Sequence, residues 1–234
     1  MQLFYNPQLK PEDKFFAFDK EESRHIVKVL RKKEGDTVNI TNGEGILFTA
    51  EVTFANEKKC EVKITRKEFF KPMPYYLHLA VAPTKMNDRY EWFLEKAAEI
   101  GIHEITPIIC GHSERTTIKS ERFEKILQSA MKQSMQFYMP KLNEAISYND
   151  FINSGNDGLL FIAHCEEADK KLLKNELKPK EKITILIGPE GDFSPKEIKA
   201  ALSKGFVPVS LGNTRLRTET AAVVAAHSVA FVNE

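Results

Sequence analysis

Cysteine is scarce in this chain, and its few cysteines form none of the patterns that disulfides or zinc sites require. The 234 residues contain three, Cys60, Cys110 and Cys165, an odd and widely spaced set without a C-x-x-C pair. Disulfide-stapled secreted domains use even sets of cysteines, and structural zinc sites use clustered ligands. The sequence therefore predicts reduced thiols, no metal site and a cytoplasmic location.

Long apolar stretches, a charge excess and the common phosphate loops are missing too. No run approaches the roughly 20 apolar residues of a membrane span, and MQLFYNPQLK does not resemble a secretory signal. The 34 basic and 33 acidic residues leave a net charge of +1, so any RNA contact must come from local clustering. Neither G-x-G-x-x-G nor G-x-x-x-x-G-K-[ST] occurs, which argues against dinucleotide-binding and P-loop proteins. We expect no membrane partner.

The patterning changes at Phe70-Lys-Pro-Met-Pro, where two prolines one residue apart indicate a linker. Before it, short alternating segments at residues 37–41, 45–54 and 59–65 predict antiparallel strands in a small barrel, with one helix near 21–30. After it, apolar segments alternate with helical ones, which predicts a parallel sheet covered by helices. The sequence thus predicts two domains, residues 1–71 and 72–234. The expected strands of the second are Tyr76–Val81, Glu104–Ile109, Gly158–Ala163, Ile183–Ile187 and Val207–Leu211, and its expected helices are Asp88–Ile100, Ser120–Phe137, Pro195–Lys204 and Glu219–Phe231.

One segment, ITILIGPEGDFSPKEI from Ile183, predicts a buried strand, a glycine-bearing loop and a helix. Ser194 is suited to cap this helix, with Pro195 at its first position, Glu197 completing a capping box and Gly205 closing its other end. Such loops at the carboxyl ends of parallel strands bind ligands in α/β proteins. A plain loop with well-formed caps is the alternative interpretation.

A second segment, VSLGNTRLRTETAAVVAA from Val209, repeats the order of strand, loop and helix. Thr218 is a suitable N-cap, and Glu219 suits the positive end of the helix. Arg215 and Arg217 lie in the loop, where they are either plain surface arginines or, facing Glu190, part of a site for an anionic or polar substrate.

Together, IGPEGDFSPKEI and LGNTRLRTETA resemble the RsmE family, the ribosomal RNA uracil-N3 methyltransferases of the SPOUT superfamily. The resemblance extends to LAVAPTKMNDRYEWFLEKAAEIGIHEITPI and to HIVKVLRKKEGDTVNITNGEG, so it covers nearly the whole chain. It has departures. The family's LGPRILRTETA differs at residues 213–215, its EQSGR is KQSMQ at residues 132–136, and its commoner GPEGG is GPEGD here.

The resemblance implies a PUA-like RNA-binding barrel followed by a trefoil-knotted SPOUT domain that acts as a homodimer and binds S-adenosylmethionine. It implies methylation of N3 of a uridine in 16S ribosomal RNA of the small ribosomal subunit. Arg217 is expected to stabilise the negative charge that develops on the uracil, and Glu190 to accept the N3 proton, to fix Arg217 or to hold the donor's amino group. The expected donor-binding residues are Ala163, His164, Ile187, Gly188, Pro189, Glu190, Gly191, Leu211, Gly212, Leu216, Arg217, Thr218, Thr220 and Ala221.

The basic run from Arg24 to Lys33 is the expected RNA contact of the barrel. It holds five basic residues and no acid, and a helix would bring Arg24, Lys28 and Arg31 to one face. Lys85 and Arg89 are further candidates, whereas Lys96 can pair with Glu95 or Glu99. Three other functions stay open: a ribosome-assembly factor without catalysis, an enzyme that uses a nucleotide cofactor, and a methyltransferase that acts on transfer RNA.

Overall fold

The computed structural model describes residues 2–166 and 169–234, which form two compact units. Unit 1 comprises the chain up to Pro72 together with Met131–Met139, and unit 2 comprises Met73–Ala130 and Pro140–Glu234. The predicted division at residue 71 stays a prediction. Residues 131–139 were expected within the second domain, and the structure groups them with unit 1.

Unit 1 is built on a curled five-stranded sheet with the strand order β1-β3-β4-β5-β2. Its apolar core includes Phe4, Ile26, Ile40 and Phe48, none of which is more than 1% exposed. Because side chains alternate along a strand, the alternation that predicted this barrel is the pattern that fills its interior. The strands are β1 (Leu3–Tyr5), β2 (Phe15–Ala17), β3 (Thr37–Thr41), β4 (Ile46–Phe54) and β5 (Glu61–Phe69).

The segment Met131–Met139 completes unit 1 through main-chain pairing. The Gly45 N–H donates to the Phe137 carbonyl over 2.8 Å, and the Met139 N–H donates to the Gly43 carbonyl over 2.9 Å. A side chain at residue 45 would place its Cβ 2.2 Å from the Tyr138 hydroxyl, so only glycine fits there. Residues 1–72 alone therefore lack part of the pairing that unit 1 uses.

The helical part of unit 1 differs from the expected single helix over residues 21–30. Helix α1 (Lys20–Arg24) passes directly into a π-helical turn, η1 (His25–Val29). Arg31 then takes a left-handed conformation with φ 56°. The expectation that Arg31 shares a helical face with Arg24 and Lys28 is therefore wrong.

Unit 2 contains an eight-stranded sheet whose main path runs β11-β13-β10-β12-β6-β7-β8, with β9 paired to β7. All of these pairs are parallel, as predicted. The chain places β12 and β13 on opposite sides of β10, so it crosses β10 after β12. The strands are β6 (Tyr76–Val81), β7 (Glu104–Ile109), β8 (Lys141–Leu142), β9 (Ile146–Ser147), β10 (Leu159–Ala163), β11 (Lys171–Leu172), β12 (Lys182–Ile187) and β13 (Val207–Ser210).

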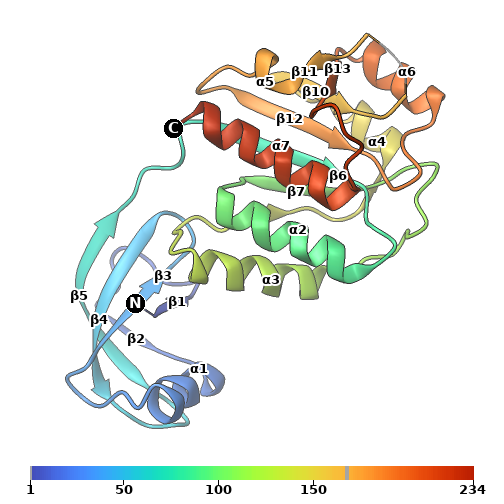
Figure 1. Cartoon of the computed structure of the whole chain (residues 1–234). Coiled ribbons are helices and arrows are strands. Elements are labelled where there is room, and N and C mark those ends of the chain that lie inside the picture. The colour runs from blue at the N-terminus through green and yellow to red at the C-terminus, as the bar shows by residue number, and fades with distance from the viewer. Residues whose placement is uncertain (1, 167–168) are drawn as a thin grey trace. The chain divides into compact units, whose positions relative to one another are not determined.

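Helices cover both faces of this sheet. Helix α7 (Thr218–Val232) lies against β6 and β12, and α2 (Asn87–Ile100) packs beside it (Figure 1). On the other face, Ala80 and Leu186 pack in one core with α4 (Tyr148–Asn153) and α6 (Pro195–Ser203). The remaining helices are α3 (Ser120–Gln133) and α5 (Leu173–Glu176). Among the described residues no helix is long and apolar enough to cross a membrane.

Candidate active site

The carboxyl ends of the parallel strands β10, β12 and β13 meet at one edge of unit 2, where two adjoining cavities lie. Each cavity has a volume of about 340 Å³. They share the wall residues Ala163, Cys165, Arg215, Leu216 and Ala221. The first is also lined by His164, Lys170, Val209, Ser210, Leu211, Gly212, Asn213 and Thr214, and the second by Ile187, Gly188, Pro189, Glu190, Asp192, Arg217 and Thr218.

Helix α6, which follows the loop after β12, is capped at both ends as the sequence predicted, but α7 begins differently. Ser194 and Glu197 form the predicted capping box, and Gly205 closes α6 with φ 87°. The N-cap of α7 is Arg217, not Thr218. The Thr218 hydroxyl instead donates to the Gly188 carbonyl over 3.0 Å, a buried hydrogen bond that ties α7 to the loop after β12.

His164 is a buried histidine whose ring makes no hydrogen bond to any described residue, although its main-chain carbonyl accepts one from the Lys170 ammonium over 2.9 Å. His164 is one of the residues that line the first cavity and is 7% exposed, and both of its ring nitrogens are buried without a partner among the described residues. The pKa of His164 is lowered mainly by burial and, to a smaller extent, by the nearby Lys170 cation, so the imidazole is neutral at pH 7. Buried polar groups in folded proteins nearly always have partners. A polar ligand in the first cavity would provide one.

Glu190 lines the second cavity, but its carboxylate is directed to the loop after β6. Its Oε1 accepts the Lys85 main-chain N–H over 3.0 Å, while Arg115 donates to the Lys85 carbonyl through Nε at 3.3 Å and Nη2 at 2.9 Å. The Lys85 ammonium pairs with Glu114 over 2.8 Å, and that contact raises the pKa of Lys85. Both main-chain polar groups of residue 85 are therefore held by side chains from other loops.

Arg215 and Arg217 line the same cavity as Glu190, as expected, yet neither pairs with it. Both side chains are exposed, and in the described part of the chain neither forms an ion pair. A guanidinium without an acidic partner keeps its donors available for an oxygen-rich ligand.

Asp192 stands where the RsmE family, which this chain resembles, more commonly has glycine. Its backbone keeps a glycine-like conformation with φ 63°. Its Oδ2 accepts the Cys165 N–H over 2.8 Å, and its Oδ1 accepts the Phe193 N–H over 2.9 Å. Short polar side chains tolerate the left-handed region better than most, because they can hydrogen-bond locally. The carboxylate thereby ties the loop after β10 to the loop after β12.

Most of the expected donor-binding residues line one of the two cavities. The exceptions are Gly191 and Thr220. Sequence reasoning missed Lys170, Val209 and Ser210, which line the first cavity, Asp192, which lines the second, and Cys165, which lines both. Of these, only Asp192 carried a signal, because it departs from the family pattern within a motif. No cluster of three or more His, Cys, Asp or Glu residues suited to a metal ion occurs among the described residues.

The expected RNA contacts fall into two groups. In unit 1, Arg24, Lys28 and Arg31 are exposed, and none forms an ion pair with a described residue. In unit 2, Lys85 pairs with Glu114, and Arg89 Nε lies 4.0 Å from Glu219 Oε1. The cations of unit 1 are therefore more available to phosphates than those of unit 2. Lys96 pairs with Glu95 and Glu99, as its sequence neighbours allowed.

Family comparison agrees with this arrangement. Residues 71–230 match the model of an RNA methyltransferase domain, and residues 18–65 match that of an RNA methyltransferase PUA domain. The chain belongs to this RNA methyltransferase family. The methyltransferase is 32% identical to the ribosomal RNA small subunit methyltransferase E of Buchnera aphidicola, over 90% of this chain and 85% of the relative.

Solved structures extend the likeness over the whole methyltransferase. A probable rRNA methyltransferase from Porphyromonas gingivalis has 38% identity and a TM-score of 0.92, covering 100% of this chain and 98% of its own. The ribosomal RNA small subunit methyltransferase E of Neisseria gonorrhoeae, solved bound to S-adenosylmethionine, has 26% identity and a TM-score of 0.87, with coverages of 100% and 98%. The predicted SPOUT-type knotted domain with a PUA-like barrel is thereby confirmed.

Proposed function

We propose that this methyltransferase transfers the methyl group of S-adenosylmethionine to N3 of a uridine in 16S ribosomal RNA. The observation that carries the proposal is the pair of cavities at the carboxyl edge of the unit 2 sheet. Their walls are formed by the loops that the resemblance assigns to the donor. The names of the relatives, which specify RNA of the small ribosomal subunit, support the substrate.

The residues present fit an adenosyl group. Ala163, Leu211 and Leu216 give the first cavity an apolar wall, as most ligand pockets have. His164 supplies a buried neutral imidazole that has no partner among the described residues, which suits hydroxyl and amino groups. When bound, S-adenosylmethionine supplies an electrophilic methyl group.

The chain's own residues must then position the uracil and stabilise its charge. N3 of uracil carries a proton, and its lone pair becomes available only when that proton leaves and negative charge spreads to O2 and O4. Arg217 lines the second cavity and has no ion-pair partner among the described residues, so in this proposal it donates to those oxygens. Because N3 lies on the Watson–Crick edge, the target uridine must be unpaired or flipped out of a stack.

Glu190 is a weaker candidate for taking the proton, because one carboxylate oxygen already accepts the Lys85 N–H. Its Oε2 accepts no hydrogen bond from a described residue, so proton transfer would use that oxygen, directly or through water. The alternative roles, fixing Arg217 or the donor's amino group, would use the same oxygen.

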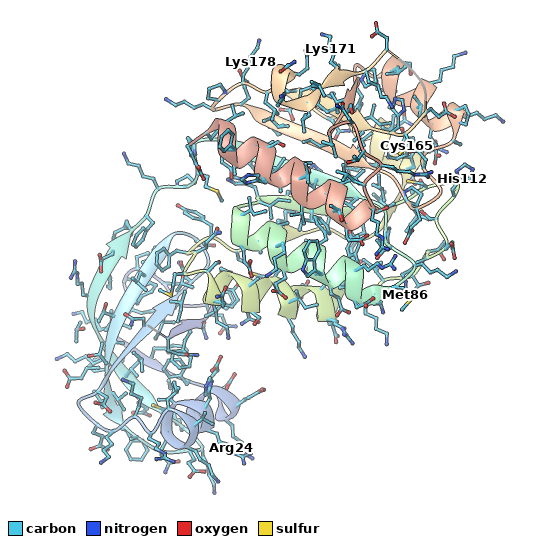
Figure 2. The ribbon with its side chains drawn as sticks, in the orientation of Figure 1. Arg24, Met86, His112, Cys165, Lys171 and Lys178 are labelled. Atoms are coloured by element: carbon cyan, nitrogen blue, oxygen red, sulfur yellow. The ribbon has the colours of Figure 1, made fainter. Side chains whose placement is uncertain are left out.

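Unit 1 is proposed to grip the RNA through the exposed cations Arg24, Lys28 and Arg31. Figure 2 shows Arg24 directed away from the barrel. Phosphate contacts of this kind give an affinity for RNA that falls as the salt concentration rises, and they do not read the sequence. The cytoplasmic location expected from the reduced thiols agrees with a ribosomal RNA substrate.

The proposed homodimer would cover the outer face of α7, which is apolar on nearly every side. Ala222, Ala225, Ala226 and Val229 are buried inside unit 2, while Phe231 is 66% exposed and His227 is exposed. A helix that is hydrophobic all round is normally buried all round. We expect Phe231→Asp to convert a dimer to a monomer, which analytical ultracentrifugation would measure.

The deciding assay incubates the purified protein and S-adenosylmethionine with 16S ribosomal RNA, 30S subunits or transfer RNA, and digests the products for mass spectrometry. We expect N3-methyluridine in the ribosomal samples only. Methylation of transfer RNA alone would replace the proposed substrate. Donor binding without methylation of any of these RNAs would favour an assembly factor.

A further inference from the structure

The loop after β7, residues 110–115, touches the loop after β12 through one histidine. His112 Nδ1 lies 3.0 Å from the Gly191 carbonyl oxygen and 3.0 Å from the Asp192 carbonyl oxygen. Both partners only accept hydrogen bonds, so Nδ1 must carry the hydrogen and donate to both. The bond is therefore present whether or not Nε2 is protonated.

This contact explains the second glycine of the GPEGD motif. Gly191 lines neither cavity, so the role expected for it as a donor ligand has no support in the cavity walls. A Cβ at residue 191 would lie 3.0 Å from the His112 Cβ and 3.6 Å from its Cγ. The 3.0 Å distance is tighter than ordinary van der Waals contact, so a side chain at residue 191 would push the histidine back by a few tenths of an ångström.

Two further sets of contacts link residues 111–115 to the chain on either side of Gly191, one directly and one through Lys85. The Gly111 N–H donates to Glu197 Oε1 over 2.8 Å, beside the capping box of α6. Arg115 holds the Lys85 carbonyl, and the Lys85 N–H in turn holds Glu190. Residues 111–115 therefore brace the loop after β12 on both sides of Gly191. Figure 2 shows His112 and Cys165 at the same end of unit 2, and Cys165 N–H is bonded to the Asp192 carboxylate.

We propose that His112 is a positioning residue for methyl transfer, which holds the loop Gly188–Asp192 in its donor-binding conformation. The inference rests on the proposed function, because it assumes that this loop binds S-adenosylmethionine. His112 itself lines neither cavity, so it acts through the two carbonyl groups and not by touching the donor. A loop that is already ordered loses less conformational freedom when it binds a ligand.

A matched pair of substitutions isolates the bond. The side-chain amide of asparagine can place an N–H close to the position of histidine Nδ1, whereas glutamine places its amide one bond farther out. His112→Asn should therefore keep the hydrogen bonds and His112→Gln should lose them. Thr116→Ala, at the exposed position directly after this loop, serves as the control.

The test combines calorimetry with S-adenosylhomocysteine, steady-state methylation kinetics and amide hydrogen exchange of the ligand-free protein. We expect His112→Gln to weaken binding by about 10-fold, and His112→Asn and Thr116→Ala to stay within about 2-fold of the parent. Gly191→Ala should also weaken binding, because it displaces the histidine. His112→Gln should further speed exchange of the Cys165 and Phe193 amides, which the Asp192 carboxylate protects.

The exchange measurement separates the inference from the proposed function. If the parent protein binds no S-adenosylhomocysteine, but amide exchange is faster in His112→Gln than in the parent, the contact of His112 with the loop is confirmed and the donor is rejected. If the parent binds S-adenosylhomocysteine, and His112→Gln shows the same affinity and the same exchange rates, the positioning role is overturned. Equal losses in the asparagine and glutamine variants would overturn it too, since a general structural role would not distinguish the two amides.

Discussion

Polar side chains differ in their hydrogen bonding between the carboxyl edge of the unit 2 sheet, where the parallel strands end, and its amino edge, where they begin. At the carboxyl edge, His164 is buried without a partner, and Arg215 and Arg217 have no ion pair among the described residues. At the amino edge, Glu104 accepts hydrogen bonds from Tyr76 over 2.5 Å and Asn143 over 2.7 Å. One edge leaves hydrogen-bonding groups available, and the other satisfies them internally.

The amino edge also contains a cavity of about 480 Å³, so available space alone does not distinguish the two edges. His78 and Thr106, which line it, are bonded to each other over 2.7 Å, and Asn143 donates to Thr106 over 2.7 Å. Polar groups that hydrogen-bond to one another stabilise a fold, whereas polar groups without a partner are available to bind a ligand. The comparison thus assigns stability to one edge and chemistry to the other.

The largest expected effect concerns Arg217 at the carboxyl edge. Arg217→Ala should lower kcat for methyl transfer by about 100- to 1,000-fold, because it removes a donor aimed at developing negative charge. The melting temperature should change little, since the side chain is exposed and unpaired. Methylation kinetics and thermal unfolding measure the two effects. Full activity in this variant would remove the arginine from the mechanism.

Glu104→Gln should have the reverse profile at the amino edge. Burial would raise the pKa of Glu104, but hydrogen bonds from Tyr76, Asn143 and Lys141, with nearby His78, lower it to about 2. We expect the substitution to destabilise the protein by about 1 to 2 kcal/mol at pH 7 and to leave methylation nearly unchanged.

The pH dependence follows from the sign of that shift. The folded pKa of Glu104 lies below the ordinary value of 4.5, so its contribution is full above about pH 4.5 and is lost as the pH falls towards 2. Urea unfolding of parent and variant should therefore differ most near neutral pH and converge in acid. A difference that grew in acid would contradict the assignment.

His164 tests whether the unpartnered group serves a ligand. His164→Leu should stabilise the ligand-free protein by about 1 kcal/mol, because it removes buried nitrogens that have no partner in the described part of the chain. The same variant should bind S-adenosylhomocysteine about 10-fold more weakly, since one hydrogen bond to the ligand is lost. Unchanged binding in calorimetry would mean that the imidazole does not contact the ligand.

The smallest effect concerns the backbone of Asp192. Asp192→Gly should be more stable than Asp192→Ala by about 1 kcal/mol, because both lose the carboxylate but only glycine relaxes the left-handed conformation. Chemical denaturation of the two variants gives this difference directly. Equal stabilities would show that residue 192 leaves that conformation once its carboxylate is gone.

Local patterns predicted most of the regular elements, because each is encoded within its own segment. Strands β6 and β7 begin and end where the apolar runs predicted. The pairing of residues 131–139 within unit 1 was not predictable, because it joins segments some 90 residues apart and no local pattern records such a pairing. The same applies to the left-handed turn at Arg31, a residue type that rarely adopts it.

The site was predicted through motif resemblance more than through physics. The resemblance assigned donor-binding loops that the structure brings to one edge. The donor contact expected for Gly191 stays a prediction, because this residue lies against His112 and lines neither cavity. His112 carried no sequence signal, because a histidine after a strand is common and its partners are main-chain carbonyls. Such contacts depend on how two loops approach each other, and a single sequence does not encode that distance locally.

A crystal structure with S-adenosylhomocysteine tests the central assignment most directly. The account predicts ligand density enclosed by Ala163, Gly188 and the loop Leu211–Leu216, with a ring nitrogen of His164 within hydrogen-bonding distance of it. Density in the amino-edge cavity beside His78, with the carboxyl-edge loops unchanged, would contradict it.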